Sequence, residues 1–134
     1  MNTEIEKILE HSSEYAKGLL MDTGEIYPFG AYIGIEGNVH PVEYDYDKKN
    51  MPTVGVVIDA LTKFCDSETK AGKMLSYGLT YEASVQLEKD ADFVDTFVID
   101  ITTKDAAKAP LYYYPYQISA NMTVKFNEPF AVKR

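Results

Sequence analysis

The amino-acid sequence predicts an α+β fold in which the helices pack on one face of a single, mostly antiparallel sheet. Two segments carry apolar residues at the 3.6-residue spacing of a helix, and six other segments have the composition of strands. Neighbouring strand segments lie close enough along the chain to form hairpins, which favours one antiparallel sheet. The chain has 134 residues without an internal repeat or linker, so we expect a single domain over residues 1–134.

A first helix is predicted over residues 3–21. Thr3 and Glu6 form a capping-box pattern, in which each side chain satisfies a backbone N–H near the other. Gly24 is expected to end the helix. One face of the segment is apolar and consists of Ile5, Ile8, Leu9, Tyr15, Ala16, Leu19 and Leu20.

Residues 27–35 and 39–46 are predicted as two strands joined by a turn over residues 36–38. Glycine and asparagine in the turn support it because both tolerate positive φ. Pro41 has no N–H to donate, so we expect the second strand to lie at an edge or to contain a bulge.

A second helix is predicted with Asn50 as its N-cap and Pro52 in its first turn. The polar stretch 66–73 is expected to fray or turn. The apolar stripe of this helix consists of Val54, Val57, Ile58, Leu61, Phe64 and Cys65.

Residues 77–88 carry the clearest strand pattern, because apolar and polar residues alternate as in a half-exposed strand. Further strands are predicted over 93–103, 111–118 and 121–126. The resulting order is helix-ββ-helix-βββ(β). This order is similar to that of the profilin and roadblock class of small regulatory domains, and a similarity of element order carries no function.

The formal net charge of −8 argues against nucleic-acid binding, since no basic stripe offsets the repulsion of a phosphate backbone. An anionic membrane surface is disfavoured for the same reason. The N-terminus lacks the basic and apolar regions of an export signal, and no apolar run approaches the length of a membrane span. Because Cys65 is the only cysteine, no internal disulfide can form. We therefore expect a soluble, cytoplasmic protein.

No residue is assigned a catalytic, cofactor-binding or metal-ligating role, and no cofactor is expected. His11 and His40 have no second histidine or cysteine at ligand spacing. Cys65 lies on the apolar stripe of the second helix, where burial makes a thiol inert. The sequence also lacks a nucleophile elbow and a glycine-rich phosphate loop.

Acidic residues leave one question open. The cluster over residues 43–47 lacks the spacing and glycine of a calcium loop, so we expect a solvated strand face there. Carboxylates can also pair across strands, for example Asp95 or Asp100 with Glu82, and the sequence does not place them.

Tyrosine is unusually frequent, with 11 copies and no tryptophan. Tyr112, Tyr114 and Tyr116 share one face of a predicted strand, while Tyr113 lies on the other face. Because clustered tyrosines are typical of interfaces, Tyr112, Tyr114, Tyr116 and Tyr32 form a candidate interaction surface. Cross-strand packing within the sheet is the alternative.

Two further residues bear on how this strand packs. Pro115 indicates an edge or a bulge in the tyrosine-rich strand. Gly30 marks a close approach in the first strand, and we expect a tyrosine from residues 112–116 to cover it.

Three stretches, "GEIYPFGAYI" (24–33), "YGLTYEASVQLE" (77–88) and "YYYPYQI" (112–118), resemble a layout seen in small bacterial proteins of about this length. Those proteins carry a Gly-Glu-aromatic-Tyr-Pro-Phe-Gly-Ala stretch after a first helix. The most specific part of the resemblance is Tyr27 to Ala31. It implies a bacterial, cytosolic protein and brings no established activity or site residues.

These observations favour a non-enzymatic protein-interaction module that self-associates or binds a protein partner. Small acidic bacterial proteins of this kind include immunity proteins that neutralise toxins, so an immunity-like role is one form of this hypothesis. The alternative is a small-molecule binder or hydrolase with a pocket between the sheet and the helices.

Overall fold

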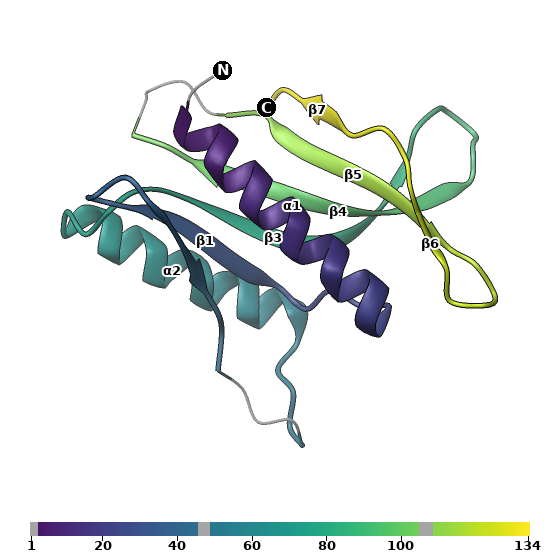
Figure 1. Cartoon of the computed structure of the whole chain (residues 1–134), viewed down its shortest axis with the longest axis horizontal. Helices are drawn as coiled ribbons and strands as arrows, with labels where there is room; N and C mark the ends of the chain where they lie inside the picture. Colours follow the sequence, from purple (N-terminus) through teal and green to yellow (C-terminus); the bar gives the residue numbers. More distant parts are fainter. Residues whose placement is uncertain (1–2, 46–48, 105–108) are drawn as a thin grey trace.

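The computed structural model of the chain describes residues 3–45, 49–104 and 109–134, which form two helices and seven strands (Figure 1). The helices are α1 (Thr3–Thr23) and α2 (Val54–Lys70). The strands are β1 (Phe29–Gly34), β2 (Val39–Val42), β3 (Met74–Gln86), β4 (Phe93–Thr102), β5 (Leu111–Ile118), β6 (Val124–Phe126) and β7 (Phe130–Val132). Tyr46 and Asp47, which belong to the predicted second strand and acidic cluster, lie outside the described residues.

The strands form one sheet in the order β2-β1-β3-β4-β5-β6, with β7 also pairing β5. All the described strand pairs are antiparallel, which confirms the predicted α+β class. β2 lies at one edge, as Pro41 indicates. Among the described residues, no helix is long and apolar enough to cross a bilayer.

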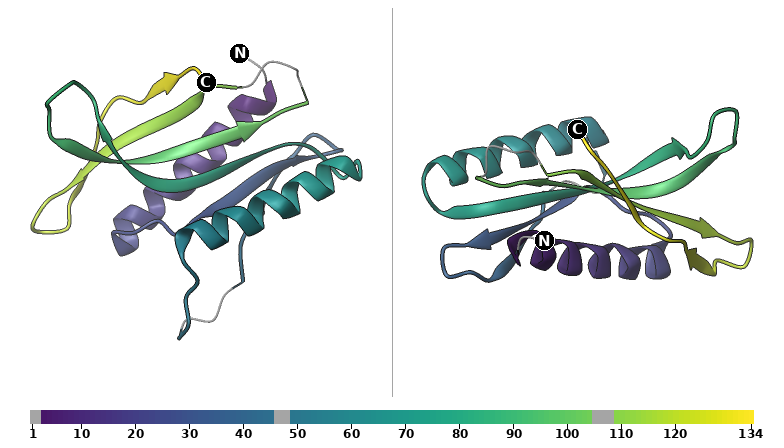
Figure 2. Two further views of the ribbon diagram at one scale, coloured as in Figure 1. Left: turned by 180° about the vertical axis from the view of Figure 1, so that it is seen from behind. Right: turned by 90° about the horizontal axis from the view of Figure 1, so that it is seen from above.

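Both helices pack on the sheet, but on opposite faces, whereas the sequence predicted that they share one face (Figure 2, right). The alternation of β3 explains this arrangement. Gly78 faces Ile8 of α1, whereas its neighbours Tyr77 and Leu79 pack with the buried side of α2. Because the first half of β3 is buried on both faces, one helix lies on each side of it.

Two hydrophobic clusters result. The larger one lies under α1 and joins Ile8 and Leu20 to strand residues such as Ile33, Phe97 and Ile99. The smaller one lies under α2 and joins Val42, Tyr77 and Leu79 to the buried stripe Val57, Leu61 and Cys65.

The N-terminus of α2 differs from the prediction. The helix begins at Val54, and Thr53 is the N-cap, because its extended backbone lets its hydroxyl accept from the amide of Val56. Asn50 and Pro52 therefore lie before the helix. At the other end α2 continues to Lys70, and Gly72 with a φ of 79° follows it.

The expected cover of Gly30 by a tyrosine from residues 112–116 is wrong. β3 and β4 separate β1 from β5, so the two segments do not meet. A Cβ added at Gly30 would instead lie 3.3 Å from Leu79 Cδ2 and 3.4 Å from Val42 Cβ.

Replacing Gly78 by alanine should destabilise the protein. The added Cβ would lie 2.7 Å from Cγ2 of the fully buried Ile8, so α1 must move or the side chain must repack. Overpacking of this kind costs about 1–3 kcal/mol in the free energy of unfolding. Gly18→Ala is the matched control, because nothing lies within 4 Å of its new Cβ, and it should stabilise α1 by about 1 kcal/mol. Urea denaturation of both variants measures the difference, and equal midpoints would contradict the close approach of α1 to β3.

Stability should fall as the pH rises from about 10 to about 12, and part of this fall should depend on Tyr77. Burial, and then the hydrogen bond of its hydroxyl to Asp66, raises the pKa of Tyr77 to about 12. In the unfolded chain the pKa is about 10, so the folded protein binds more protons between these values and loses stability as the pH rises. Tyr77→Phe should therefore flatten the dependence of the denaturation midpoint on pH in this range. An unchanged slope would contradict the assignment.

Candidate functional site

Tyr112, Tyr114 and Tyr116 lie on the face of β5 that α1 covers, and they pack against the larger core. Tyr114 stacks on Phe97 with 4.7 Å between the ring centroids, and Tyr116 is only 5% exposed. Burial raises the pKa of all three hydroxyls, most strongly at Tyr116. Tyr32 lies on the opposite face, where it stacks with His40. The structure therefore does not bring the four predicted residues together as one surface.

Pro115 lies between two strands that share one side of β5. β7 pairs with Leu111 to Tyr113, and β6 pairs with Tyr116 to Ile118. Between these ladders the carbonyl of Pro115 accepts from the amide of Asn127. The missing N–H of Pro115 thus falls at a break in the pairing, and not at a free edge of the sheet.

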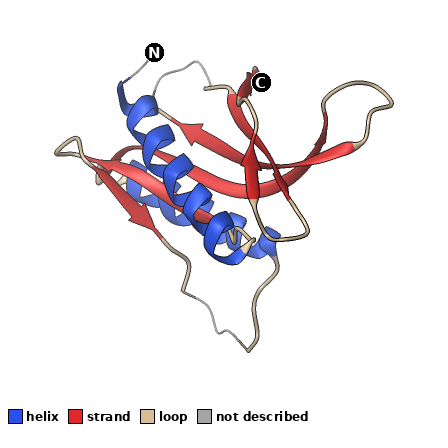
Figure 3. Cartoon of the chain, turned by 45° about the vertical axis from the view of Figure 1, so that its right-hand side comes forward, coloured by secondary structure: helices blue, strands red, loops and turns tan. Residues whose placement is uncertain are grey.

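Neither helix of the described residues covers the other face of the same strands. α2 packs on β1 and β3, and β4 and β5 extend beyond it (Figure 2, left). The hairpin of β3 and β4 also projects past both helices (Figure 3). We call this surface the open face. It consists of Tyr81, Ala83 and Val85 of β3, Val94 and Val98 of β4, Leu111 and Tyr113 of β5, and Phe130 and Val132 of β7.

Aromatic side chains dominate the open face. The strand register places Tyr81, Val98, Tyr113 and Phe130 in one row across four strands. Tyr113 and Phe130 stack with 5.1 Å between their ring centroids, while Val98 beneath the row is buried. Val98 is therefore covered by its neighbours, and the half-buried rings of Tyr81, Tyr113 and Phe130 form the outer surface.

The open face carries little charge. Asp100 is the one charged residue that the register places among its described strand residues, and Arg134 Nη2 lies 2.6 Å from its Oδ1. Arg134 also donates to the backbone carbonyls of Ala109 and Ile101, which fixes its position. Burial, followed by the charge of Asp100, raises the pKa of Tyr81. The face is therefore nearly neutral in a chain whose formal net charge is −8.

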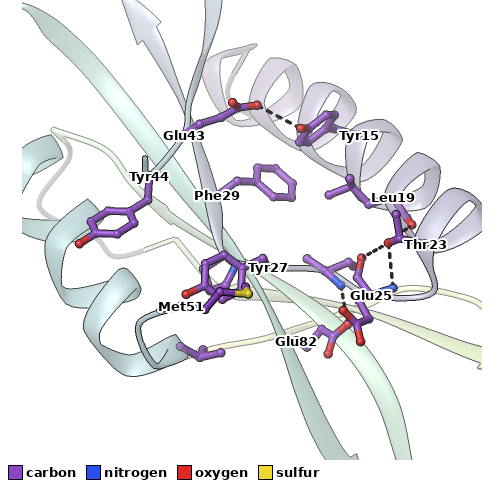
Figure 4. A pocket seen from close by; sticks show the side chains of 13 residues that line it. Tyr15, Leu19, Thr23, Glu25, Tyr27, Phe29, Glu43, Tyr44, Met51 and Glu82 are labelled. Carbon is purple, nitrogen blue, oxygen red and sulfur yellow. Dashed lines mark hydrogen bonds between the residues drawn. The ribbon is translucent and has the colours of Figure 1, made fainter. Parts of the chain in front are cut away.

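A hollow of about 530 Å³ lies where the C-terminal half of α1 meets the start of β1, the end of β2 and the start of α2 (Figure 4). We call it the acidic groove. Its rim carries the carboxylates of Glu25, Glu43 and Glu82, and its floor consists of apolar residues that include Leu19, Ile26 and Phe29.

The polar groups of the acidic groove are positioned by hydrogen bonds. Glu82 Oε1 accepts from the amide of Ile26 at 2.7 Å, and Glu43 Oε1 accepts from the hydroxyl of Tyr15 at 3.1 Å. The hydroxyl of Tyr27 donates to the carbonyl of Pro52, which holds its ring against the segment before α2. Figure 4 shows Tyr44 turned toward α2 and away from the centre of the groove.

Asp95 and Asp100, the two candidate cross-strand partners of Glu82, lie on opposite faces of the sheet. Asp95 lines a hollow together with Glu82 and Tyr116, next to the acidic groove. Asp100 lies on the opposite face in its pair with Arg134.

Groups that would indicate catalysis do not converge among the described residues. No three His, Cys, Asp or Glu side chains in the described part of the chain are placed to hold a metal ion. His40 pairs with Glu36, whose pKa is lowered by that hydrogen bond, and His11 lies on the surface of α1. Cys65 is buried, and burial raises the pKa of its thiol to about 11. A thiol with this pKa stays protonated at neutral pH and is a poor nucleophile.

The open face was not predicted, because the tyrosine pattern of β5 favours the opposite side, which carries Tyr112, Tyr114 and Tyr116. The signal that could have found it is the apolar alternation of residues 77–88, which continues past Leu79 to Tyr81, Ala83 and Val85. The alternation does not predict whether a helix covers the far end of the strand, because that depends on the length and position of the helix.

No protein-family model, curated protein or solved structure matches the chain. The open face and the acidic groove are therefore interpreted from their own geometry.

Proposed function

We propose that the chain is a non-enzymatic interaction module that pairs with a second copy of itself through the open face. The observation that carries this proposal is an aromatic, nearly neutral sheet surface with no helix over it. Exposed apolar surfaces of this kind mark protein–protein contacts because burying them removes apolar area from water. Tyrosine and phenylalanine are also the residues enriched at the centres of interfaces.

The charge of the chain favours a second copy as the occupant. Two copies that each carry a formal charge of −8 repel one another, and the repulsion is weakest where both present an uncharged surface. The open face is such a surface, since Arg134 neutralises Asp100. A two-fold axis can place the row of Tyr81, Tyr113 and Phe130 against its own copy.

The open face has an aromatic centre with an apolar surround. Tyr81, Tyr113 and Phe130 are half-buried in the sheet, so each presents part of its ring to a partner. These three side chains form the aromatic centre. Val85, Val94 and Val132 extend the apolar surface around it.

The remaining features of the proposal come from the sequence. The resemblance to small bacterial proteins supports a bacterial, cytoplasmic location. The acidic charge argues against nucleic acid and anionic membranes as partners. The lack of convergent catalytic groups among the described residues favours binding over chemistry. An immunity-like role is compatible with these features and would place a toxin on this surface.

Sedimentation equilibrium of the purified protein tests the pairing. Wild type should be a dimer, and Tyr113→Glu and Val132→Glu should each weaken the dimer at least tenfold, because a lost interface anchor costs about 2 kcal/mol or more. Val132 is 43% exposed on β7, so its substitution leaves the core intact. Phe93→Glu is the matched control, since Phe93 is 68% exposed and lies on the other face of β4, and it should leave the dimer unchanged.

A monomeric wild type would contradict self-association, and it is also the result expected if an immunity-like protein keeps this face for a toxin. A dimer that Phe93→Glu disrupts while Val132→Glu and Tyr113→Glu do not would place the interface elsewhere. Circular dichroism of each variant shows whether the fold is retained.

A further inference from the structure

The acidic groove lies apart from the open face and has the dimensions of a small-molecule site. Its volume of about 530 Å³ falls within the range of roughly 300–1,000 Å³ that such sites span. Ile26 and Phe29 on its floor are each only 4% exposed, so the floor is a fixed part of the core. A ligand with an apolar body can therefore rest on a preformed surface.

The charges around this floor have one sign. Glu25, Glu43 and Glu82 come from three separate segments, and no Lys, Arg or His is found among the described residues that line the groove. Glu43 accepts from Tyr15 through one carboxylate oxygen, whereas Glu82 accepts from the amide of Ile26 and also hydrogen-bonds the hydroxyl of Tyr116. The Glu25 carboxylate has no ion-pair partner among the described residues. Carboxylate oxygens thus remain available to a donor that enters the groove.

The aromatic rings add to this preference. Tyr15 meets Phe29 edge to face, with 4.7 Å between the centroids and 88° between the planes. Figure 4 shows Phe29 and Leu19 facing the middle of the groove, with the Glu43–Tyr15 pair at one end and Glu25 and Glu82 at the other. Aromatic faces attract cations through their quadrupole, and carboxylates repel anionic ligands.

A metal ion does not fit this arrangement. The carboxylates stand around an apolar floor, and in the described part of the chain no three ligand groups are close enough to share an ion. A cation bound here must bring its own apolar surface and must satisfy separated carboxylates with several N–H donors.

We propose that the acidic groove binds a small organic cation, an amine or guanidine attached to an apolar body. The apolar body lies on Leu19, Ile26 and Phe29, and the cationic group faces the carboxylates of the rim. This site is independent of pairing through the open face, because none of these residues belongs to that face.

A set of ligands that differ only in charge tests the proposal on the full chain. The probes are phenethylamine, its neutral counterpart 2-phenylethanol and the anionic phenylacetate, with agmatine as a guanidine. Binding is followed by the amide shifts in ¹H–¹⁵N spectra. We expect the two cations to shift groove amides such as Ile26 and Glu43, with an affinity at least tenfold higher for phenethylamine than for the neutral alcohol, and no binding of phenylacetate.

Two variants test the carboxylates. Glu25→Gln and Glu43→Gln remove one charge each from exposed positions, and each should weaken phenethylamine binding several-fold, while added salt should weaken it in the wild type. Glu88→Gln is the control, because it removes the same charge in the exposed turn after β3. All three variants should retain the oligomeric state of the wild type, so failure of this site is distinguishable from failure of the proposed pairing.

Three results would overturn the proposal. The first is equal binding of the amine and the alcohol, and the second is an equal loss of affinity in Glu88→Gln. The third is the absence of any shift by either cation at about 10 mM, a concentration that detects even very weak binding. Binding of an arginine-containing peptide without binding of the small cations would instead identify a protein partner, and it would also overturn this ligand class.

Discussion

The fold depends on β1 and the first half of β3 being buried on both faces. Because every second side chain of a strand points to the same side, Gly78 faces α1 while Tyr77 and Leu79 face α2. On the α1 side the neighbouring strand β1 supplies apolar side chains such as Ile33, so each face of the sheet buries apolar area under a helix. The missing side chain at Gly78 lets Ile8 approach the sheet closely, and this contact anchors α1 across the centre of the molecule.

Two helices do not cover a sheet of this width equally on both faces. On the α1 side, Phe97, Tyr114 and Tyr116 fill the space beside the helix and complete the larger core. On the α2 side, the helix covers β1 and β3, and the apolar alternation of the chain continues beyond it into β4, β5 and β7. The open face is therefore a direct consequence of where α2 lies, and the acidic groove forms on the α1 side of the sheet, beside the starts of β1 and α2.

Local patterns predicted the elements well and their assembly less well. The alternation of residues 77–88 and the spacing of Ile5 to Leu20 identified β3 and α1, because periodicity is a property of neighbouring residues. The placement of the helices on opposite faces and the burial of Tyr116 depend on contacts between distant segments, which no local pattern contains. Neither the open face nor the acidic groove was predicted as such, since each is formed by residues that only the folded chain brings together, such as Tyr113 with Phe130 and Glu25 with Glu82.

The proposed pairing requires that a second copy covers the open face in solution. Mixing isotope-labelled and unlabelled chains and recording isotope-filtered nuclear Overhauser effects reports contacts between copies directly. Pairing through the open face should give intermolecular signals from the methyl groups of Val85, Val94 and Val132 to the aromatic protons of Tyr81, Tyr113 and Phe130. Intermolecular signals confined to other exposed residues such as Ile35, or none at all, would contradict it.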